Sequence, residues 1–487
     1  MATPIRRLQA LLRDIAPVSA TDDRTIEALA TNSREVAPGS LFIATAGQRV
    51  DGRAYIAEAC ARGAVAVVYD ASGATPPAVS VPSIGVPELR RHIGTIADRF
   101  YGAPSQDMVV IGVTGTNGKT TCTQVLAQAL DRAPQRCAII GTLGYGFPGA
   151  LASGAHTTPD AVSVQRLLDE FRAAQATHVS MEVSSHALDQ HRVGAVAFEI
   201  AVFTNLTRDH LDYHGDMAAY GAAKARLFTW PGLKTAVINS DDAFGRELQQ
   251  RARGHCRVLT YGLEQGDVHA RTWQATPQGL VLHAITPAGE ALIESPLLGR
   301  FNALNLLAVL AVLIALDISP ADAAARLSAA RPVPGRVERF ARHGSPLVVV
   351  DYAHTPDALE QVLTALRAHV RGQLWCVFGC GGNRDRGKRP QMGRIAEQLA
   401  DRVIVTDDNP RDESGDAIVA DIVAGMRARP IVIRDRAEAI AHAVRTAAAA
   451  DVILVAGKGH EDYQEVRGVR RAYSDRDTVR AVLGVAA

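Results

Sequence analysis

Short apolar runs alternate with longer mixed segments through most of the chain. Between residue 108 and about residue 330 the runs are "MVVI", "RCAIIGT", "HVSMEVSS", "FEIAVFTNL" and "KTAVINSDD", with helical segments between them. This alternation predicts a parallel sheet covered by helices. The stretch "ARPVPGRVERF", which holds two prolines and a glycine, then interrupts the pattern and predicts a linker between domains.

Two further sets of runs predict two more α/β domains. After the linker come "LVVVDYA", "QLWCVFG", "DRVIVTDD", "PIVIRD" and "DVILVAGKG"; near the N-terminus come "GSLFIATAG" and "GAVAVVYD", followed by the helical stretch "ELRRHIGTIADRFYGAPS". A chain of 487 residues is too long for one hydrophobic core. We therefore predict three domains, at residues 1–88, 89–331 and 332–487.

The composition is that of an ordinary globular protein, with 47% hydrophobic and 21% charged residues. Because 52 basic residues balance 51 acidic ones, nothing indicates attraction to nucleic acid or to a membrane surface. The six cysteines are scattered, which indicates neither a disulfide framework nor a zinc site and fits a reducing cytoplasm. No apolar run is long enough to span a bilayer, and "MATPIRRLQALLRDIAP" predicts an amphipathic helix rather than a signal sequence.

The stretch "GVTGTNGKTT" at residues 112–121 carries the clearest chemical signal. It joins an apolar run to a helical one, and its glycines let backbone N–H groups approach phosphate oxygens. Lys119 is placed to reach the β- and γ-phosphates, and the Thr120 hydroxyl to reach Mg²⁺. Because Val113 stands where the usual motif has its first glycine, the loop is a shortened G-x-x-G-K-T variant. The alternative is an ordinary glycine turn before a helix.

Three further polar stretches lie in the same domain. They are "HTTPD" at 156–160, "SMEVSSHALDQHR" with Glu182, and "FTNLTRDHLDYHGDMAAYGAAKARLF" with Asp209, His210, Asp212, His214 and Lys224. A carboxylate such as Glu182 at a strand end is a ligand that Mg²⁺ prefers, and His210 with its neighbouring carboxylates indicates a second cation site. The alternative for "HTTPD" is a helix N-cap, and the alternative for Glu182 is a solvated strand end. For the third stretch the alternative is a solvated loop with an exposed lysine.

Polar clusters also follow the predicted strands of the C-terminal domain, where ligands of open α/β sheets bind. They contain Arg384, Arg389, Asp408, Asn409, Arg411 and Glu461. Both signs of charge at neighbouring strand ends suit a zwitterionic substrate, and a solvated rim is the alternative.

Taken in order, the motifs of the chain resemble those of the Mur ligase family over essentially the whole length. They are "TGTNGKTT", "HTTPD", "EVSSHAL", "TNLTRDHLDYHG", "GRFNALNLLA", "PGRVE", "DYAHTPDAL", "GCGGNRDRGKRP", "DDNPR" and "AGKGHEDYQ". The resemblance implies an α/β protein with a central P-loop-type parallel-sheet ATPase domain. An N-terminal α/β domain that binds the UDP end of the substrate and a Rossmann-like C-terminal domain that binds an amino acid would flank it. The family usually has Asn before "TTPD", whereas this chain has His156.

The same resemblance implies a role for each matching residue. The residues implied for ATP are Gly115, Thr116, Asn117, Gly118, Lys119, Thr120, Thr121, Asn302 (towards adenine), Arg336 and Asp351. The residues implied for the UDP-linked substrate are Thr31, Ser33, Gln48, Arg49, Val50, His156, Thr157, Thr158, Ser184, Gln190 and Arg192. The residues implied for diaminopimelate are Arg384, Asp408, Asn409, Pro410, Arg411, Gly457 and Glu461. Lys224 matches a carbamylated lysine, the implied catalytic set is Lys119, Glu182, His210 and Lys224, and the implied metal ligands are Thr120, Glu182, His210 and the carbamate.

The implied reaction is ATP-dependent amide-bond formation by way of an acyl phosphate, in peptidoglycan precursor synthesis. Its substrates would be UDP-N-acetylmuramoyl-L-alanyl-D-glutamate, meso-diaminopimelate and ATP, with Mg²⁺ (two ions) as cofactor. We expect a cytoplasmic monomer that binds neither nucleic acid nor membrane.

Three other functions make different demands on the sequence. A folylpolyglutamate synthase or a D-alanyl-D-alanine-adding ligase would keep the phosphate loop but would not need "DNPR" together with Arg384. A GTP-binding switch protein would carry an N/T-K-x-D motif on a later strand, and the sequence has none there. A simple binding module would leave the set of Lys119, Glu182, His210 and Lys224 unexplained.

Overall fold

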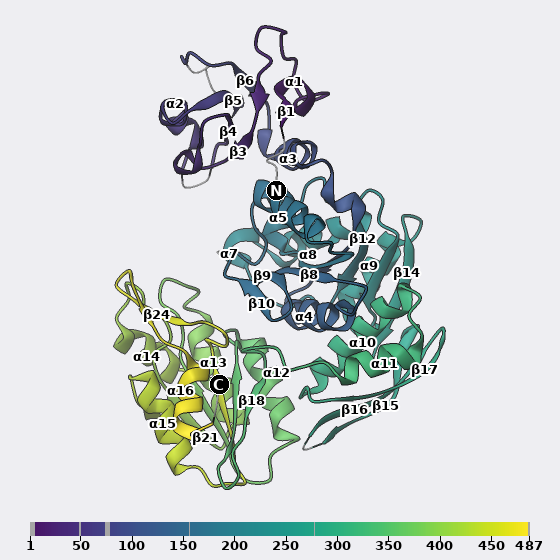
Figure 1. Ribbon diagram of the computed structural model, residues 1–487. Coiled ribbons are helices and arrows are strands. Elements are labelled where there is room, and N and C mark those ends of the chain that lie inside the picture. Colours follow the sequence, from purple (N-terminus) through teal and green to yellow (C-terminus); the bar gives the residue numbers. More distant parts are fainter. Residues whose placement is uncertain (1–4, 48–49, 74–77, 155, 277, 486–487) are drawn as a thin grey trace.

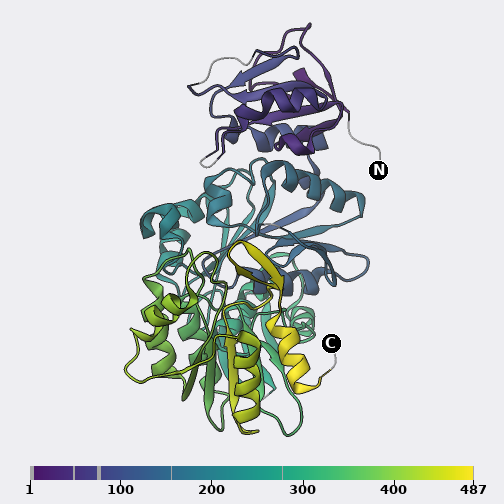
Figure 2. The ribbon, with the colours of Figure 1, turned by 90° about the vertical axis from the view of Figure 1, so that its left-hand side faces the viewer.

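The computed structural model describes residues 5–47, 50–73, 78–154, 156–276 and 278–485, and three main β-sheets divide this chain. The N-terminal part, purple in Figure 1, and the C-terminal part, green to yellow, lie at opposite ends of the molecule. The turned view in Figure 2 shows the same order, with the central part between them. The α/β class and the three-part layout predicted from the sequence are confirmed. The boundaries after residues 88 and 331 stay predictions.

The N-terminal part is built on a four-stranded parallel sheet. The strands of this sheet are β3 (Ala28–Ala30), β4 (Ser40–Ala44), β5 (Ala64–Asp70) and β6 (Ser83–Val86). A separate two-stranded sheet is formed by β1 (Arg6–Arg7) and β2 (Thr25–Ile26). The helices of this part are α1 (Leu8–Leu11), α2 (Ile56–Ala61) and α3 (Ile93–Tyr101). The helix predicted for the N-terminal stretch is much shorter than expected. Its leucines are buried, but the helix ends at Leu11, and Asp14 beyond it adopts a positive φ of 61°, which a helix does not allow.

The central part holds an 11-stranded sheet in the order β10-β9-β8-β11-β7-β12-β13-β14-β15-β16-β17. The strands are β7 (Val109–Thr114), β8 (Cys137–Gly141), β9 (Gly144–Phe147), β10 (Ala150–Ala152), β11 (His178–Glu182), β12 (Phe198–Phe203), β13 (Thr235–Asn239), β14 (Arg257–Gly262), β15 (Val268–Thr276), β16 (Gly279–Thr286) and β17 (Gly289–Ser295). The helices are α4 (Lys119–Leu130), α5 (Ala161–Ala173), α6 (Ser185–Asp189), α7 (Leu211–His214), α8 (Met217–Ala225), α9 (Ala243–Ala252), α10 (Arg300–Ala315) and α11 (Pro320–Ser328).

The middle of this sheet, from β8 to β14, is parallel and has apolar clusters on both faces. Helices α4, α10 and α11 cover one face, whereas α5, α6 and α9 cover the other. Strands buried on both sides read as continuous apolar runs, which is why the sequence predicted them well.

The other end of the central sheet differs from the prediction. Alternating strands and helices were expected up to about residue 330, but β15, β16 and β17 form an antiparallel meander. Only one face of it is covered, by α10 and α11, and buried and exposed positions therefore alternate along β17. The two strands β9 and β10 at the opposite edge are antiparallel as well.

The C-terminal part is a six-stranded sheet in the order β18-β19-β23-β20-β21-β22, parallel except for the pair β18–β19. Its strands are β18 (Glu338–Phe340), β19 (Leu347–Asp351), β20 (Leu374–Phe378), β21 (Arg402–Val405), β22 (Ile431–Val432) and β23 (Val452–Ala456), followed by the hairpin β24 (Tyr463–Val466) and β25 (Val469–Ala472). Its helices are α12 (Pro356–Arg367), α13 (Lys388–Leu399), α14 (Gly415–Val423), α15 (Arg436–Thr446) and α16 (Asp475–Leu483). Helices cover both faces, as in the central sheet.

Among the described residues, none of the helices combines the length and the apolar character that a membrane crossing needs.

Candidate active site

The phosphate loop lies between β7 and α4, as the sequence predicts. Gly118 precedes the helix with φ at 86°, and a Cβ atom there would lie 2.5 Å from Asn305 Oδ1, so both the conformation and the space favour glycine. Asn205, just after β12, holds the loop from outside. Its backbone carbonyl accepts from the Thr116 N–H at 2.8 Å, and its Oδ1 accepts from the Asn117 N–H at 2.9 Å.

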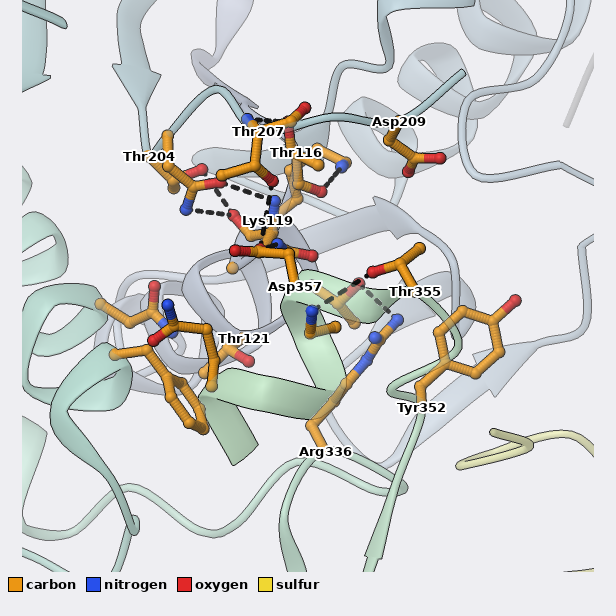
Figure 3. Close-up of a pocket in the computed structure, with 18 of the residues that line it drawn as sticks. Thr116, Lys119, Thr121, Thr204, Thr207, Asp209, Arg336, Tyr352, Thr355 and Asp357 are labelled. Atoms are coloured by element: carbon orange, nitrogen blue, oxygen red, sulfur yellow. Dashed lines mark hydrogen bonds between the residues drawn. The ribbon is translucent and has the colours of Figure 1, made fainter. Parts of the chain in front are cut away.

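A cavity of about 540 Å³ opens beside this loop, between the central and C-terminal parts (Figure 3). The predicted site residues that line it are Thr116, Asn117, Gly118, Lys119, Thr120, Thr121, Thr157, Glu182, Ser184, His210, Lys224, Asn302, Arg336 and Asp351. The structure therefore brings the whole predicted catalytic set and most of the predicted ATP contacts to one cavity.

Two lysines converge on one backbone carbonyl of the loop. Lys119 Nζ and Lys224 Nζ each donate to the Gly115 oxygen at 2.8 Å, and Lys119 also donates to the Thr116 oxygen at 2.8 Å. Lys224 is 1% exposed and its ammonium lies 4.3 Å from the centre of the Tyr220 ring. Burial, reinforced by the positive charge of Lys119, holds the pKa of Lys224 well below its ordinary value. The expectation of an exposed, solvated lysine is wrong, and the environment favours the uncharged amine.

Glu182 ends β11 inside the cavity and is 1% exposed. Its Oε2 accepts from the hydroxyls of Thr120 and Thr142, both at 3.0 Å, and its Oε1 accepts from the Thr142 N–H at 2.8 Å. The sequence reasoning did not single out Thr142, which follows β8 and has no motif of its own. Its position beside Glu182 depends on the pairing of β8 with β11.

Arg336 reaches the same place from the linker between the two parts. Its Nη2 donates to Thr120 Oγ1 at 3.2 Å, and its guanidinium lies 4.6 Å from the centre of the Tyr352 ring. Its Nε is buried and, among the described residues, has no hydrogen-bond partner. A partly buried guanidinium with a buried, unused donor suits an anionic ligand.

His210 sits on the rim of the cavity in a left-handed conformation, with φ at 54°. Its Nε2 lies 3.4 Å from Asp209 Oδ2, and burial lowers the pKa of its imidazole. Within the part of the chain that the structure describes, no group of three or more His, Cys, Asp or Glu side chains could hold a metal ion by itself. The donors that fit Mg²⁺ are the hard oxygens of Glu182 and Thr120, so further ligands would have to come from a phosphate or a modified side chain.

The predicted contacts to the muramoyl-dipeptide lie around the end of β11. Thr158 Oγ1 donates to the Glu182 carbonyl at 2.8 Å, and Thr157 Oγ1 is hydrogen-bonded to Thr142 Oγ1 at 3.0 Å. Arg192 donates to Gln190 Oε1 from both Nε (3.0 Å) and Nη2 (2.6 Å).

Two residues of these stretches cap helices. Asp160 of "HTTPD" caps α5, as the alternative for that stretch allowed, and Ser184 caps α6. His156 is exposed and borders a second cavity, of about 560 Å³, between β9 and α5.

The residues predicted for the uridine end lie in the N-terminal part, away from the first cavity's lining. Ser33 is buried and donates to Glu58 Oε2 at 3.1 Å, whereas Thr31 and Val50 are exposed. Gln48 and Arg49 lie outside the described residues.

Asn302 and Asp351 line the same cavity. Asn302 donates from Nδ2 to the Leu298 oxygen at 2.8 Å, and its Oδ1 accepts from Asn305 at 3.0 Å. Asp351 accepts from the Val337 and Ala353 N–H groups at 2.8 and 2.7 Å, while burial raises the pKa of its carboxyl.

The predicted amino-acid contacts gather at the ends of β20, β21 and β23. Asn409 Nδ2 donates to Glu461 Oε2 at 2.9 Å, and a Cβ atom on Gly457 would lie 2.7 Å from Asp408 Oδ2. Arg411 Nη1 donates to the Gly382 oxygen at 2.9 Å, in the loop that also carries Arg384. Pro410 lies between Asn409 and Arg411 in this cluster.

Arg389 belongs to a different environment. It is completely buried and forms ion pairs of 2.9 Å with both Glu413 and Asp421, so it stabilises the packing of α13 against α14. Its grouping with the substrate-binding arginines is wrong, because its charge is already matched inside the domain.

Comparison with known proteins agrees with this layout. Models of the Mur ligase family match residues 25–101 ("Mur ligase family, catalytic domain"), 113–313 ("Mur ligase middle domain") and 335–459 ("Mur ligase, glutamate ligase domain"). The chain is 52% identical to the UDP-N-acetylmuramoyl-L-alanyl-D-glutamate--2,6-diaminopimelate ligase of Alkalilimnicola ehrlichii, over 98% of this chain and 99% of that protein. It is 53% identical to the protein of the same name in Pseudomonas aeruginosa, over 95% of this chain and 96% of that protein.

Solved structures give the same result. A structure of a ligase with that name is 38% identical, covers 99% of both chains and superimposes with a TM-score of 0.72. The folylpolyglutamate synthase of Mycobacterium tuberculosis, at 19% identity and a TM-score of 0.65, covers 81% of this chain and 96% of its own and shares the fold alone. On its sequence, its fold and its phosphate-loop cavity, the chain belongs to the Mur ligase family.

Proposed function

We propose that this protein is the ATP-dependent ligase that adds meso-diaminopimelate to the D-glutamate of UDP-N-acetylmuramoyl-L-alanyl-D-glutamate, giving ADP and phosphate. The observation that carries the proposal is 52% identity along 98% of the chain to a protein of that name. The phosphate loop that opens onto a cavity between two parts supports it, because the reaction must bring substrates from different domains together.

The reaction proceeds in two steps. The γ-carboxylate of the D-glutamyl residue attacks the γ-phosphorus of ATP, ADP leaves, and an acyl phosphate forms. The neutral amine of diaminopimelate then attacks the acyl carbon, the tetrahedral intermediate expels phosphate, and the amine releases a proton. Lys119 and Arg336 supply positive charge where two anions meet, and the loop orients them, so the chain acts mainly by positioning and by electrostatic stabilisation.

Mg²⁺ fits the oxygen donors of the cavity. Glu182 and Thr120 would hold one ion, and His210 with a carbamate on Lys224 would hold a second. Bound Mg²⁺ reduces the repulsion between the carboxylate and the triphosphate. The carbamate forms when an uncharged amine adds CO₂, and burial, which lowers the pKa of Lys224, favours that form. It would place an anion in the cavity where the unmodified side chain carries an amine.

The remaining site residues divide among the three substrates. Thr31, Ser33, Gln48, Arg49 and Val50 would bind uridine diphosphate, and His156, Thr157, Thr158, Ser184, Gln190 and Arg192 the muramoyl-dipeptide. Asn302 would face adenine, and the cluster from Arg384 to Glu461 would bind diaminopimelate. We propose that the reaction takes place in the cytoplasm, where ATP is the energy source, and that the enzyme acts as a monomer.

An amino-acid panel tests the function. Phosphate release is measured with ATP and the UDP-linked dipeptide against meso-diaminopimelate, its other isomers, lysine, ornithine and D-alanyl-D-alanine. We expect meso-diaminopimelate to support turnover at far lower concentration than the rest. Preference for lysine or for D-alanyl-D-alanine would overturn the proposed acceptor, and turnover with none of them would overturn the ligase assignment.

A further inference from the structure

Lys458 is a buried cation at the centre of the polar cluster that follows β23. Its side chain has no exposed surface. Its Nζ donates to Glu461 Oε2 at 2.9 Å and to Asn409 Oδ1 at 3.1 Å, and it lies 3.8 Å from Asp408 Oδ1. The sequence reasoning did not single it out, because a lysine between two glycines in "AGKGH" reads as part of a loop.

Lys458 and Asn409 together fix one oxygen of Glu461. Oε2 accepts from Lys458 Nζ and from Asn409 Nδ2, both at 2.9 Å. Glu461 is 17% exposed at its side chain, and among the described residues its Oε1 accepts no hydrogen bond. One oxygen is therefore anchored inside the protein and the other is left for a ligand.

Asn409 is fully engaged in this arrangement. Its Oδ1 accepts from Lys458 Nζ at 3.1 Å and from the Glu465 N–H at 2.9 Å, which uses both lone pairs, while its Nδ2 donates to Glu461. An incoming ammonium group cannot bind Asn409 Oδ1 without displacing one of these donors. Asn409 therefore holds Glu461 in place in this structure, in addition to its place in the proposed amino-acid site.

The charges in the cluster point in the same direction. Asp408 and Glu461 are two carboxylates close to the ammonium of Lys458, so these three side chains together carry one excess negative charge. An ammonium group of the substrate would balance it. Without Lys458 the two carboxylates would face each other with a buried gap between them, and Glu461 would lose the donor that fixes its direction.

We propose that Lys458 is a positioning residue for the amino-acid substrate, acting through Glu461 and without touching the substrate itself. The proposal rests on the function proposed above. Lys458 holds Oε2 so that Oε1 of Glu461 meets the ammonium group of the amino acid, next to the carboxylate that Arg411 is placed to bind.

A double-mutant cycle separates this role from a purely structural one. Lys458→Met, Glu461→Gln and the double variant are compared for KM for meso-diaminopimelate, KM for ATP, kcat and Tm. Each single variant should raise KM for diaminopimelate by at least about tenfold, the effect of losing one hydrogen bond to a charged group, with KM for ATP nearly unchanged. Because Lys458 acts through Glu461, the double variant should be no worse than Glu461→Gln alone.

Two further variants keep the test decisive. Ile453→Ala removes buried packing from β23, the strand that precedes Lys458, and should lower Tm without changing KM for diaminopimelate, which shows what lost stability alone does. Lys458→Gln, which keeps a donor but no charge, takes the place of Lys458→Met if the latter does not fold, and the same non-additivity is expected.

The outcomes distinguish the two proposals. If the effects of Lys458→Met and Glu461→Gln multiply, or if Lys458→Met lowers only Tm, the positioning role is wrong although the ligase function stands. If the wild-type enzyme does not use diaminopimelate at all, the proposed function itself fails.

Discussion

Asp357 of α12 accepts a hydrogen bond from Asn117 of the phosphate loop, with 3.0 Å between Nδ2 and Oδ2. The same oxygen accepts from Thr207 Oγ1 at 3.2 Å. Both contacts cross from the C-terminal part to the central part. In Figure 3, Asp357 lies between Lys119 and Thr355 and is directed at the phosphate loop. One carboxylate thus links the two walls of the cavity in this structure.

Replacing Asp357 by Ala should loosen the link between the two parts. Two hydrogen bonds to a charged group are lost, each worth about 1.5–3 kcal/mol. We expect a larger radius of gyration in small-angle X-ray scattering without nucleotide, and a KM for ATP raised several-fold. Glu360→Ala, an exposed change on the same helix, is the control and should alter neither. An unchanged radius of gyration for Asp357→Ala would show that other contacts hold the parts together.

Lys119→Ala should remove ATP turnover while the fold persists. Among the described residues Lys119 bonds only to carbonyls of its own loop, so its loss costs little stability, whereas the reacting phosphate loses a charge-assisted donor worth about 10²–10³ in rate. Phosphate release and circular dichroism are the measurements, with the exposed Lys234→Ala as control.

Turnover in the wild-type enzyme should also require both co-substrates, because the acyl phosphate forms only on a bound carboxylate. Rapid ATP hydrolysis without the UDP-linked substrate would instead indicate a switch or a motor.

Lys224→Ala should also be inactive if Lys224 carries a carbamate. Lys224→Glu would resupply an anion near the metal and should recover part of the activity, while Lys224→Arg, which keeps a cation, should recover none. Labelled ¹³C-bicarbonate gives a direct readout, as a carbamate resonance that is present in the wild type and absent from Lys224→Ala. Normal activity in the alanine variant would eliminate the idea.

Arg411→Ala should relax the choice of meso-diaminopimelate over lysine. The Arg411 guanidinium donates to the Gly382 oxygen, and Glu465 Oε2 lies 3.8 Å from its Nε. These two contacts hold the guanidinium in place for a carboxylate. Lysine lacks that second carboxylate, and a site built around such bonds rejects the analogue by roughly 10⁴-fold. The ratio of kcat/KM for the two amino acids is the measurement. Arg470→Ala, which removes another arginine near Glu465, should leave the ratio unchanged.

Acid should weaken the C-terminal part through Glu413. The hydrogen bonds from Arg389 and from the Asn383 N–H lower the pKa of Glu413 from 4.5 to about 2. Because the folded-state pKa is depressed, this stabilisation is complete above pH 4.5 and is lost as the pH falls from 4.5 towards 2. Urea unfolding of the wild type and of Glu413→Gln should therefore differ at pH 7 and converge near pH 2. Parallel curves across this range would contradict the assignment.

Much of the central site follows from the sequence alone. An apolar strand, a glycine-rich turn with Lys119 and a helix are local in sequence, and short-range geometry suffices to place a phosphate loop there. The continuous apolar runs likewise indicated the parallel strands, because such strands are buried on both faces. The order of the motifs was enough to indicate the family.

The tertiary structure decided what distant segments do together. Strand order and helix packing bury Lys224 beside Lys119 and bring two threonine hydroxyls to Glu182. They also place Lys458 between Asn409 and Glu461. The sequence placed Arg389 among the candidate substrate residues because its acidic partners, 24 and 32 residues away, meet it only in the folded chain. A residue's charge and position can be read from the sequence, but its desolvation and its partners are properties of the packed chain.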